Sequence, residues 1–149
     1  TRGAILPIAA QGPAVLAVAN RTAAKAHELR DDFAQHVALQ TGGYDELAGE
    51  AFDVLINATS AGRGEGAAFT LPLSLVNSLT TAVDLNYGEA AIPFLAWARA
   101  AGCRNEFDGL GMLVEQAAES FQQWHGVRPE TDAVYAALRD RDKVLVTAD

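Results

Sequence analysis

Four residues that follow an apolar run have side chains able to hold a phosphate group. The small and apolar residues Val15–Ala19 end at Asn20, Arg21 and Thr22, and Lys25 follows one helical turn later. An arginine guanidinium can grip phosphate oxygens in pairs, and the N–H groups at a helix start attract anions. In dinucleotide-binding folds an acidic residue here bonds the adenosine ribose, so a cation instead favours the 2′-phosphate of NADP. The alternative interpretation is a solvated helix cap that carries a surface arginine.

A second candidate stretch is "NATSAG" at residues 57–62, which comes at the end of another apolar run. Its small residues Thr59, Ser60 and Ala61 would let a backbone pass close to a flat ring or a pyrophosphate. The alternative interpretation is a plain turn at the end of a strand.

The third candidate stretch, "DGLGMLVEQAAESF" at residues 108–121, places polar and soft groups at the start of a helix. Gly109 allows a close backbone approach, and Met112 offers a polarisable surface that could pack on a nicotinamide. Gln116 lies one turn further along the same face and can both donate to and accept from a substrate hydroxyl. Alternatively, Met112 belongs to the core and Gln116 to the surface.

The composition is that of an ordinary globular protein with one domain. The 149 residues are 50% hydrophobic and 20% charged, with a formal net charge of −8. This charge disfavours long nucleic acids and anionic membranes as partners, because both are bound through many cations. A small anion held by a few local cations remains compatible with it. No apolar run approaches the roughly 20 residues of a membrane span, and we identify no signal peptide.

The cysteine and histidine residues indicate neither a disulfide nor a metal site. Cys103 is the single cysteine, so we expect a reducing, cytoplasmic setting. His27, His36 and His125 lack the spacing to cysteines or carboxylates that is typical of metal ligands. We therefore assign no metal to this chain.

Short apolar runs alternate with helical patterns, which predicts an α/β fold. We expect a Rossmann-like, doubly wound parallel sheet in three layers, forming a single domain over residues 1–149. Predicted strands lie at 15–19, 37–39, 52–58, 82–85 and 104–107, and predicted helices at 23–33, 92–101, 108–124 and 130–141. Thr22 is the expected N-cap of the first of these helices. The terminal residues 142–149 contain the β-prone "KVLVTAD" and form either a tail or a strand.

Four motifs give the chain a family resemblance. In order and spacing, "ANRTAAKA", "FDVLINATSAG", "VDLNYGEAAIPFLAWARAAGC" and "DGLGMLVEQAAESFQQWHGVRP" resemble the C-terminal half of shikimate dehydrogenase, up to about Leu138. The resemblance implies NADP-dependent, reversible hydride transfer between 3-dehydroshikimate and shikimate in aromatic amino-acid biosynthesis. The open alternatives are a quinate-accepting relative, which could prefer NAD, and a non-catalytic Rossmann-like interaction domain.

The resemblance also assigns roles to individual residues. The family's phosphate loop reads G-A-G-G-A-[ST]-R-G, and this chain enters it at Thr1 and Arg2. Tyr87 and Gln116 match residues that face the substrate, and Gly109 and Met112 match those beside the nicotinamide. The remaining matches concern the 2′-phosphate and the cofactor-lining turn, namely Asn20, Arg21, Thr22, Lys25, Thr59, Ser60 and Ala61.

No catalytic residue is assigned, because the family's catalytic lysine and aspartate belong to an N-terminal substrate domain. We interpret Asp84 as a cap at a strand end and Asp108 as the residue that opens a helix. The isolated chain is expected to bind NADP weakly, if at all, and not to turn over, since hydride transfer needs a positioned substrate and a proton donor.

The resemblance implies that the first strand of the sheet is missing from this chain. In the strand order 3-2-1-4-5-6 it would lie between the strands at 15–19 and 52–58. Three alternatives follow for the gap. The strand lies outside the present numbering, the sheet closes up or swaps between chains, or the terminal "KVLVTAD" occupies the gap.

Overall fold

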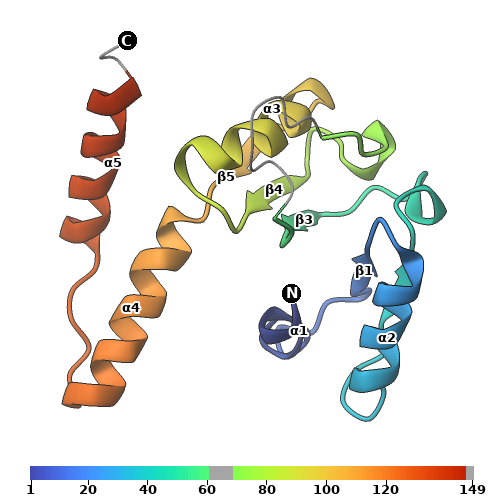
Figure 1. Cartoon of the computed structure of the whole chain (residues 1–149), viewed down its shortest axis with the longest axis horizontal. Coiled ribbons are helices and arrows are strands. Elements are labelled where there is room, and N and C mark those ends of the chain that lie inside the picture. The colour runs from blue at the N-terminus through green and yellow to red at the C-terminus, as the bar shows by residue number, and fades with distance from the viewer. Residues whose placement is uncertain (61–68, 147–149) are drawn as a thin grey trace.

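The computed structural model describes residues 1–60 and 69–146, and for residues 142–146 it describes the backbone alone. Helices alternate with short strands along the chain (Figure 1). The elements are α1 (Arg2–Ala9), β1 (Ala17–Ala19), α2 (Ala23–Phe33), β2 (Gln40–Gly42), η1 (Asp45–Leu47), β3 (Val54–Asn57), η2 (Leu73–Leu75), β4 (Thr81–Asp84), η3 (Gly88–Ala91), α3 (Ile92–Ala100), β5 (Asn105–Phe107), α4 (Leu110–His125) and α5 (Asp132–Val146).

The strands form two parallel sheets, which confirms the predicted α/β class. One sheet has the order β1-β2 and the other the order β3-β4-β5. In the larger sheet, Val54 pairs with Thr81 and Asn57 pairs with Asp84, so β3 and β4 end level with one another. Because all pairings are parallel, the carboxyl ends of the strands within each sheet lie along one edge.

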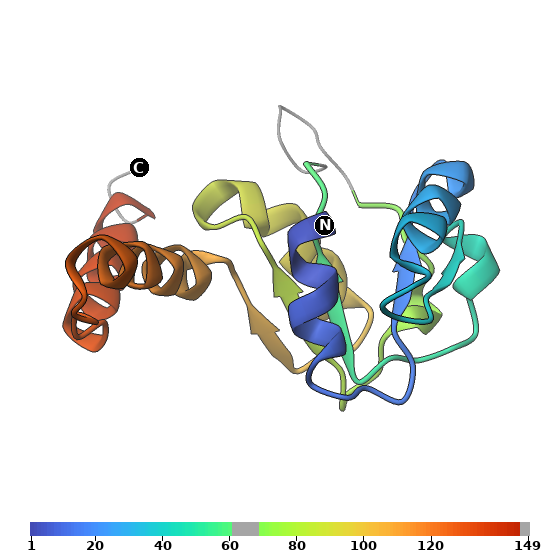
Figure 2. The same cartoon turned by 90° about the horizontal axis from the view of Figure 1, so that it is seen from below.

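The two sheets divide at the predicted gap. Among the described residues, β1 pairs with β2 alone and β3 pairs with β4 alone, so each keeps one unpaired edge. Figure 2 shows α1 in the region of this division. The Thr1 hydroxyl at the start of α1 donates to the carbonyl oxygen of Ala58 at 3.3 Å, and Ile5 is buried. The start of α1 is thereby fixed beside the carboxyl end of β3.

Most elements lie close to their predicted positions, and two differ. The helix predicted at 23–33 is confirmed as α2. The second strand begins at Gln40 rather than residue 37, because its hydrogen bonds to β1 start at the Gln40 N–H, which donates to the Leu16 carbonyl at 3.0 Å. At the other end α5 continues to Val146. Local helix continuation outweighs the β-propensity of residues 143–146, so these residues do not fill the gap as a strand.

The core lies between α3 and the larger sheet. Phe94 is 1% exposed, and its ring lies 5.7 Å from that of Trp97 and 5.5 Å from that of Phe69. The Trp97 indole N–H donates to the Leu71 carbonyl at 3.0 Å, which holds the segment around Leu71 against α3. Cys103 is buried, and its thiol donates to the Thr80 carbonyl. Apolar packing around Phe94 thus supports the strands that carry the polar residues described below. No helix in residues 1–60 and 69–146 is long and apolar enough to cross a membrane.

Candidate functional site

The candidate residues come from the turns that follow the strands. Residues 20–22 follow β1, residues 58–60 follow β3, residues 85–88 follow β4, and residues 108–109 follow β5. In parallel sheets the crevice outside the carboxyl ends of the strands is where ligands bind. The fold therefore brings three of the four predicted groups to one edge of the larger sheet, and the fourth to the same edge of the smaller one.

The turn after β1 is held by the side chain of Asn20, and Thr22 is the N-cap of α2. The Asn20 side-chain oxygen accepts the Thr22 N–H at 3.0 Å, while Thr22 occupies the N-cap position of α2 without a side-chain capping bond. The expectation that Thr22 is the N-cap residue of this helix is thus confirmed, although its hydroxyl forms no capping bond. Asn20 closes the turn locally, as asparagine often does two residues before a backbone N–H. The Thr22 hydroxyl stays exposed at the start of α2.

Two cations in this turn are exposed and lack a carboxylate partner. Within residues 1–60 and 69–146, neither Arg21 nor Lys25 forms an ion pair or a side-chain hydrogen bond. Most other described arginines are paired, for example Arg30 with Asp31 at 3.0 Å. In a chain with a net charge of −8, two uncommitted cations at a helix start form a local positive site. Their chemistry suits a small anion such as a phosphate group.

The start of α1 also lies at the carboxyl edge. Thr1 contacts Ala58, directly after β3, and Thr1, Arg2 and Gly3 are exposed. Arg2 differs from Arg21 in that its guanidinium forms an ion pair with Asp32 of α2. The first turn of α1 therefore offers backbone N–H groups at this edge, and the charge of Arg2 is shared with a neighbouring helix.

A buried polar network, formed by Asn57, Thr59, Asp84 and Asn86, joins the turns after β3 and β4. Asp84 is fully buried, and its carboxylate accepts the Asn57 amide at 2.9 Å and both the N–H and the amide of Asn86 at 2.8 Å. The Asn57 oxygen accepts the Thr59 N–H at 3.1 Å and the Thr59 hydroxyl at 2.8 Å. The Asn86 amide also donates to the Thr59 carbonyl at 3.2 Å. Asp84 thus occupies the strand-end position that the sequence predicts.

Gly109 packs directly against the turn after β4. Its N–H donates to the Asn86 carbonyl at 2.7 Å. A Cβ atom on Gly109 would lie 2.7 Å from the carbonyl carbon of Leu85, 3.1 Å from the Asn86 oxygen, and closer still to the Leu85 oxygen. These obstacles are backbone atoms, so a side chain has no room here. Close backbone approach, which the sequence predicts for Gly109, takes place between two turns of the protein itself.

The other candidates near α4 are exposed at the same edge. Tyr87 and Met112 are each 49% exposed, which contradicts the alternative that places Met112 in the core. Gln116 is exposed, and its amide donates to the Leu113 carbonyl at 3.0 Å. Ser60 is exposed as well, whereas Ala61 lies outside the described residues.

Asp108 opens α4, as predicted, and also binds an arginine that the sequence analysis did not single out. Its carboxylate accepts the Leu110 N–H at 3.2 Å and forms a two-point ion pair with Arg139 of α5. Burial by itself raises the pKa of Asp108, but the hydrogen bonds from Arg139 and the Leu110 N–H and the charge of Arg139 outweigh it and lower the pKa below its usual value of 3.8. The hydrogen bond to Asp108 raises the pKa of Arg139. This pair holds α5 against the start of α4.

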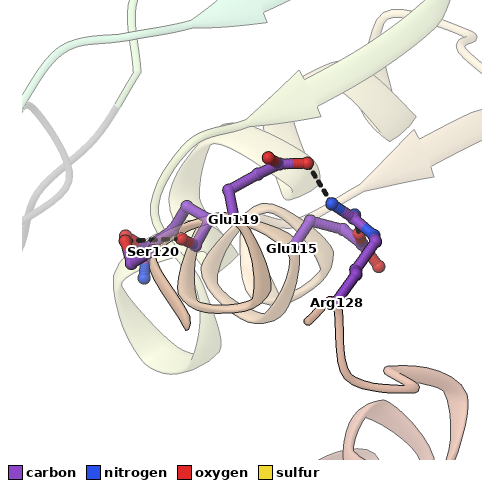
Figure 3. A network of polar contacts seen from close by, with 5 residues as sticks. Glu115, Glu119, Ser120 and Arg128 are labelled. Atoms are coloured by element: carbon purple, nitrogen blue, oxygen red, sulfur yellow. Dashed lines mark hydrogen bonds and ion pairs between the residues drawn. The ribbon is translucent and has the colours of Figure 1, made fainter. Parts of the chain in front are cut away.

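The far end of α4 is held by a second arginine. Arg128, in the connection between α4 and α5, donates to Glu115 at 2.6 Å and also to Glu119, so one guanidinium bridges two turns of α4 (Figure 3). On a neighbouring face, the Ser120 hydroxyl donates to the Gln116 carbonyl at 2.9 Å. The hydrogen bonds to Glu119 and Glu115 raise the pKa of Arg128. Arg128 and both glutamates are exposed, so these ion pairs orient the connection more than they stabilise it.

Comparisons with known proteins identify relatives of the chain that carries this edge. A model of the shikimate 5′-dehydrogenase C-terminal domain matches residues 109–139. The shikimate dehydrogenase (NADP(+)) of Stenotrophomonas maltophilia (strain K279a) is 60% identical over 135 residues, which are 90% of this chain and 48% of that protein. The chain is homologous to the C-terminal half of shikimate dehydrogenase.

Two solved structures agree with this homology. A crystal structure of an Ael1 enzyme from Pseudomonas putida shares 44% identity and a TM-score of 0.81, over 91% of this chain and 49% of the other. Shikimate 5-dehydrogenase from Thermus thermophilus, solved in complex with NADP(H) and shikimate, shares 30% identity and a TM-score of 0.68, over 92% and 50% of the two chains. The chain spans about half the length of the curated shikimate dehydrogenases it matches.

The residues that join the motifs to one another could not be identified from the sequence. Asn57 and Asn86 were part of quoted motifs, but their side chains face neighbouring strands and no spacing along the chain predicts this. Arg139 lies 31 residues after Asp108, beyond any local pattern. Within the described residues no cluster of three potential metal ligands occurs. His27 instead bonds the Thr41 hydroxyl at 2.9 Å.

The Asp108–Arg139 pair predicts a pH-dependent contribution to stability. Arg139→Gln is expected to lower the free energy of unfolding at about pH 7 by about 2 kcal/mol, because a nearly buried carboxylate loses its charged partner. A carboxyl group whose folded pKa is lowered contributes stability above its unfolded pKa, and this is lost as the pH falls through the folded pKa. The deficit of the variant should therefore shrink at about pH 3.

Urea unfolding at the two pH values measures this. The matched control is Arg30→Gln, which removes the exposed Arg30–Asp31 pair and should change stability by less than about 0.5 kcal/mol. A deficit of Arg139→Gln that is equal at both pH values would show that the loss comes from packing and not from the charge on Asp108.

Proposed function

We propose that this chain is the NADP-binding half of a cytoplasmic shikimate dehydrogenase, which reduces 3-dehydroshikimate reversibly to shikimate. The observation that carries the choice of cofactor is the pair of cations, Arg21 and Lys25, that lack a carboxylate partner in the described part of the chain. The homology to proteins named shikimate dehydrogenase (NADP(+)) supports the choice of reaction.

In this proposal the turn after β1 binds the 2′-phosphate of NADP. The guanidinium of Arg21 meets two phosphate oxygens, and the ammonium group of Lys25 adds a second charge from the first turn of α2. The exposed hydroxyl of Thr22 and the first N–H groups of α2 donate to the same group. Asn20 holds the turn in shape through its bond to the Thr22 N–H at 3.0 Å.

The pyrophosphate and the nicotinamide are assigned to the larger sheet and α1. Thr1 and Arg2 at the start of α1 would face the pyrophosphate, and Thr59 and Ser60 would line the cofactor beside it. The nicotinamide ring, when bound, supplies or accepts the hydride. Met112, half exposed at the start of α4, would cover one side of the ring and exclude water from it. Gly109 keeps the backbone of this turn close to the turn after β4.

Substrate contacts are assigned to Tyr87 and Gln116. The phenol of Tyr87, which is 49% exposed, and the exposed amide of Gln116 can each donate to and accept from substrate hydroxyl groups. These residues orient a polyhydroxylated ring, and the proposal assigns the proton transfer to neither of them.

Cofactor discrimination tests the proposal. Arg21→Ala is expected to weaken binding of NADP(H) by about 30-fold and binding of NAD(H) by less than about twofold, because only the first cofactor carries the 2′-phosphate. Lys25→Ala should weaken NADP(H) binding by about fivefold. Isothermal titration or NADPH fluorescence measures both.

The matched control is Arg104→Ala. Arg104 is also exposed and forms no ion pair within residues 1–60 and 69–146, but it precedes β5 at the opposite edge of the sheet. It should leave both affinities unchanged. An Arg21→Ala protein that loses affinity for both cofactors equally, or for neither, would contradict the phosphate assignment.

A further inference from the structure

The turns assigned to cofactor and substrate are connected through one buried carboxylate. The turn after β3 carries Thr59, the turn after β4 carries Tyr87, and the start of α4 carries Gly109. Asp84 lies between them at the end of the central strand of the larger sheet, and none of its surface is exposed. It contacts neither the cofactor nor the substrate in the proposed function, so its role has to be transmitted by its neighbours.

The direction of each hydrogen bond in the buried polar network is fixed by the carboxylate. The Asp84 carboxylate oxygens accept every hydrogen bond described for this side chain, so the NH2 group of Asn57 faces Asp84 and donates to it at 2.9 Å. The other end of that amide, its oxygen, then faces Thr59 and accepts its N–H and its hydroxyl. Through Asn57, the acceptor character of Asp84 sets the position of the Thr59 turn.

The same carboxylate sets the turn after β4. It accepts the N–H and the side-chain amide of Asn86, both at 2.8 Å, which bends the chain immediately before Tyr87. The Asn86 carbonyl then points at Gly109 and accepts its N–H at 2.7 Å. Each of the three turns is therefore one side chain or one peptide group away from Asp84.

We infer that Asp84 is a positioning residue that holds the cofactor turn at Thr59, the substrate turn at Tyr87 and the start of α4 in register through the side chains of Asn57 and Asn86. The inference rests on the proposed function for the ligands of these turns. The inference adds that ligand affinity depends on Asp84 accepting hydrogen bonds rather than donating them, although no ligand contacts Asp84.

Asp84→Asn tests the polarity with almost no change in volume. The new amide can keep its oxygen toward Asn86 only by facing its NH2 group toward the NH2 group of Asn57, so two donors meet. If Asn57 turns over to relieve this, its NH2 group faces the Thr59 N–H instead. In either case the bond chain to the Thr59 turn is broken, and NADPH binding should weaken by about tenfold.

The double variant Asn57→Asp with Asp84→Asn provides a rescue. Residue 57 then accepts from Thr59 with one oxygen and from the new amide of residue 84 with the other, while that amide's oxygen accepts from Asn86. Every bond of the network is restored with the same total charge. NADPH affinity should return to within about threefold of the starting protein. Asp53→Asn, an exposed residue just before β3, is the matched control and should change nothing.

Amide hydrogen exchange followed by NMR tests the positioning without any ligand. In Asp84→Asn the N–H groups of Thr59 and Gly109 should exchange at least about tenfold faster than before, relative to amides within β4 such as that of Ala82, and the double variant should restore them. Uniform acceleration of all amides would indicate a merely structural role and overturn the inference. So would a double variant that fails to restore folding or exchange.

The two measurements separate this inference from the proposed function. If exchange at Thr59 and Gly109 becomes faster in Asp84→Asn and returns in the double variant, and NADPH affinity changes in parallel, both the inference and the proposed function are supported. Local exchange that responds while NADPH affinity does not change supports the positioning role and contradicts the assignment of these turns to the cofactor. Unchanged exchange at Thr59 and Gly109 overturns the inference, whatever the affinity does.

Discussion

Gly109→Ala is expected to destabilise the protein by about 3 kcal/mol or more, although it adds a single methyl group. The added Cβ would lie 2.7 Å from the Leu85 carbonyl carbon, and the Leu85 oxygen is nearer still. Neither atom can move alone, because both belong to the turn that the buried polar network holds. The start of α4 must shift away from β4, which should also break the Gly109 N–H bond to Asn86. Urea unfolding measures the loss.

Gly111→Ala provides the matched control two residues further along. A Cβ on Gly111 would meet only the Tyr135 ring, at an ordinary contact distance of 3.8 Å, and Gly111 lies within α4. Alanine in a helix interior is favoured over glycine by about 0.5–1 kcal/mol, so this variant should be as stable as the original or more stable. Equal effects of the two substitutions would contradict the close contact at Gly109.

Phe94→Ala is expected to have the largest effect of any single substitution in the core, a loss of about 3–5 kcal/mol in the free energy of unfolding. The side chain is 1% exposed and contacts the rings of Trp97 and Phe69. Its removal leaves a cavity between α3 and the larger sheet, and the surrounding elements cannot close on it without losing the Trp97 bond to Leu71.

Chemical denaturation monitored by tryptophan fluorescence would measure this, with Phe107→Ala as the control. Phe107 is 57% exposed on β5, so its truncation should cost less than about 1 kcal/mol. A Phe94→Ala protein with an unchanged denaturation midpoint would mean that the region around α3 is not the core on which the strands depend.

The elements could be predicted because their signals are local. β1, β3 and β4 belong to short apolar runs that are followed by polar turns, and α2 begins and ends where the cap and the helical pattern indicate. The strand at Gln40–Gly42 was misplaced because its position is set by pairing with β1, and its sequence, Gln-Thr-Gly, has no apolar pattern. Residues 143–146 were misjudged because a helix already in progress continues through β-branched residues.

The candidate site was predictable to the extent that its residues follow strands. Arg21 and Lys25 could be named because their polar turn follows a predicted strand, whereas Tyr87 was named from the family resemblance. What could not be predicted is which polar groups bind each other across it. Asn57 and Asp84 meet because two strands end level, and Arg139 meets Asp108 because α5 turns back onto α4. Such contacts depend on the packed structure as a whole.

The division between the two sheets has a consequence for how a ligand and the fold would affect each other. The cations proposed for the 2′-phosphate are attached to β1, whereas the residues proposed for the nicotinamide are attached to β4, β5 and α4. No backbone ladder joins these two groups among the described residues. A dinucleotide bound as proposed would contact both sheets and connect them. Binding of the cofactor should therefore make the two sheets move and unfold together as one unit.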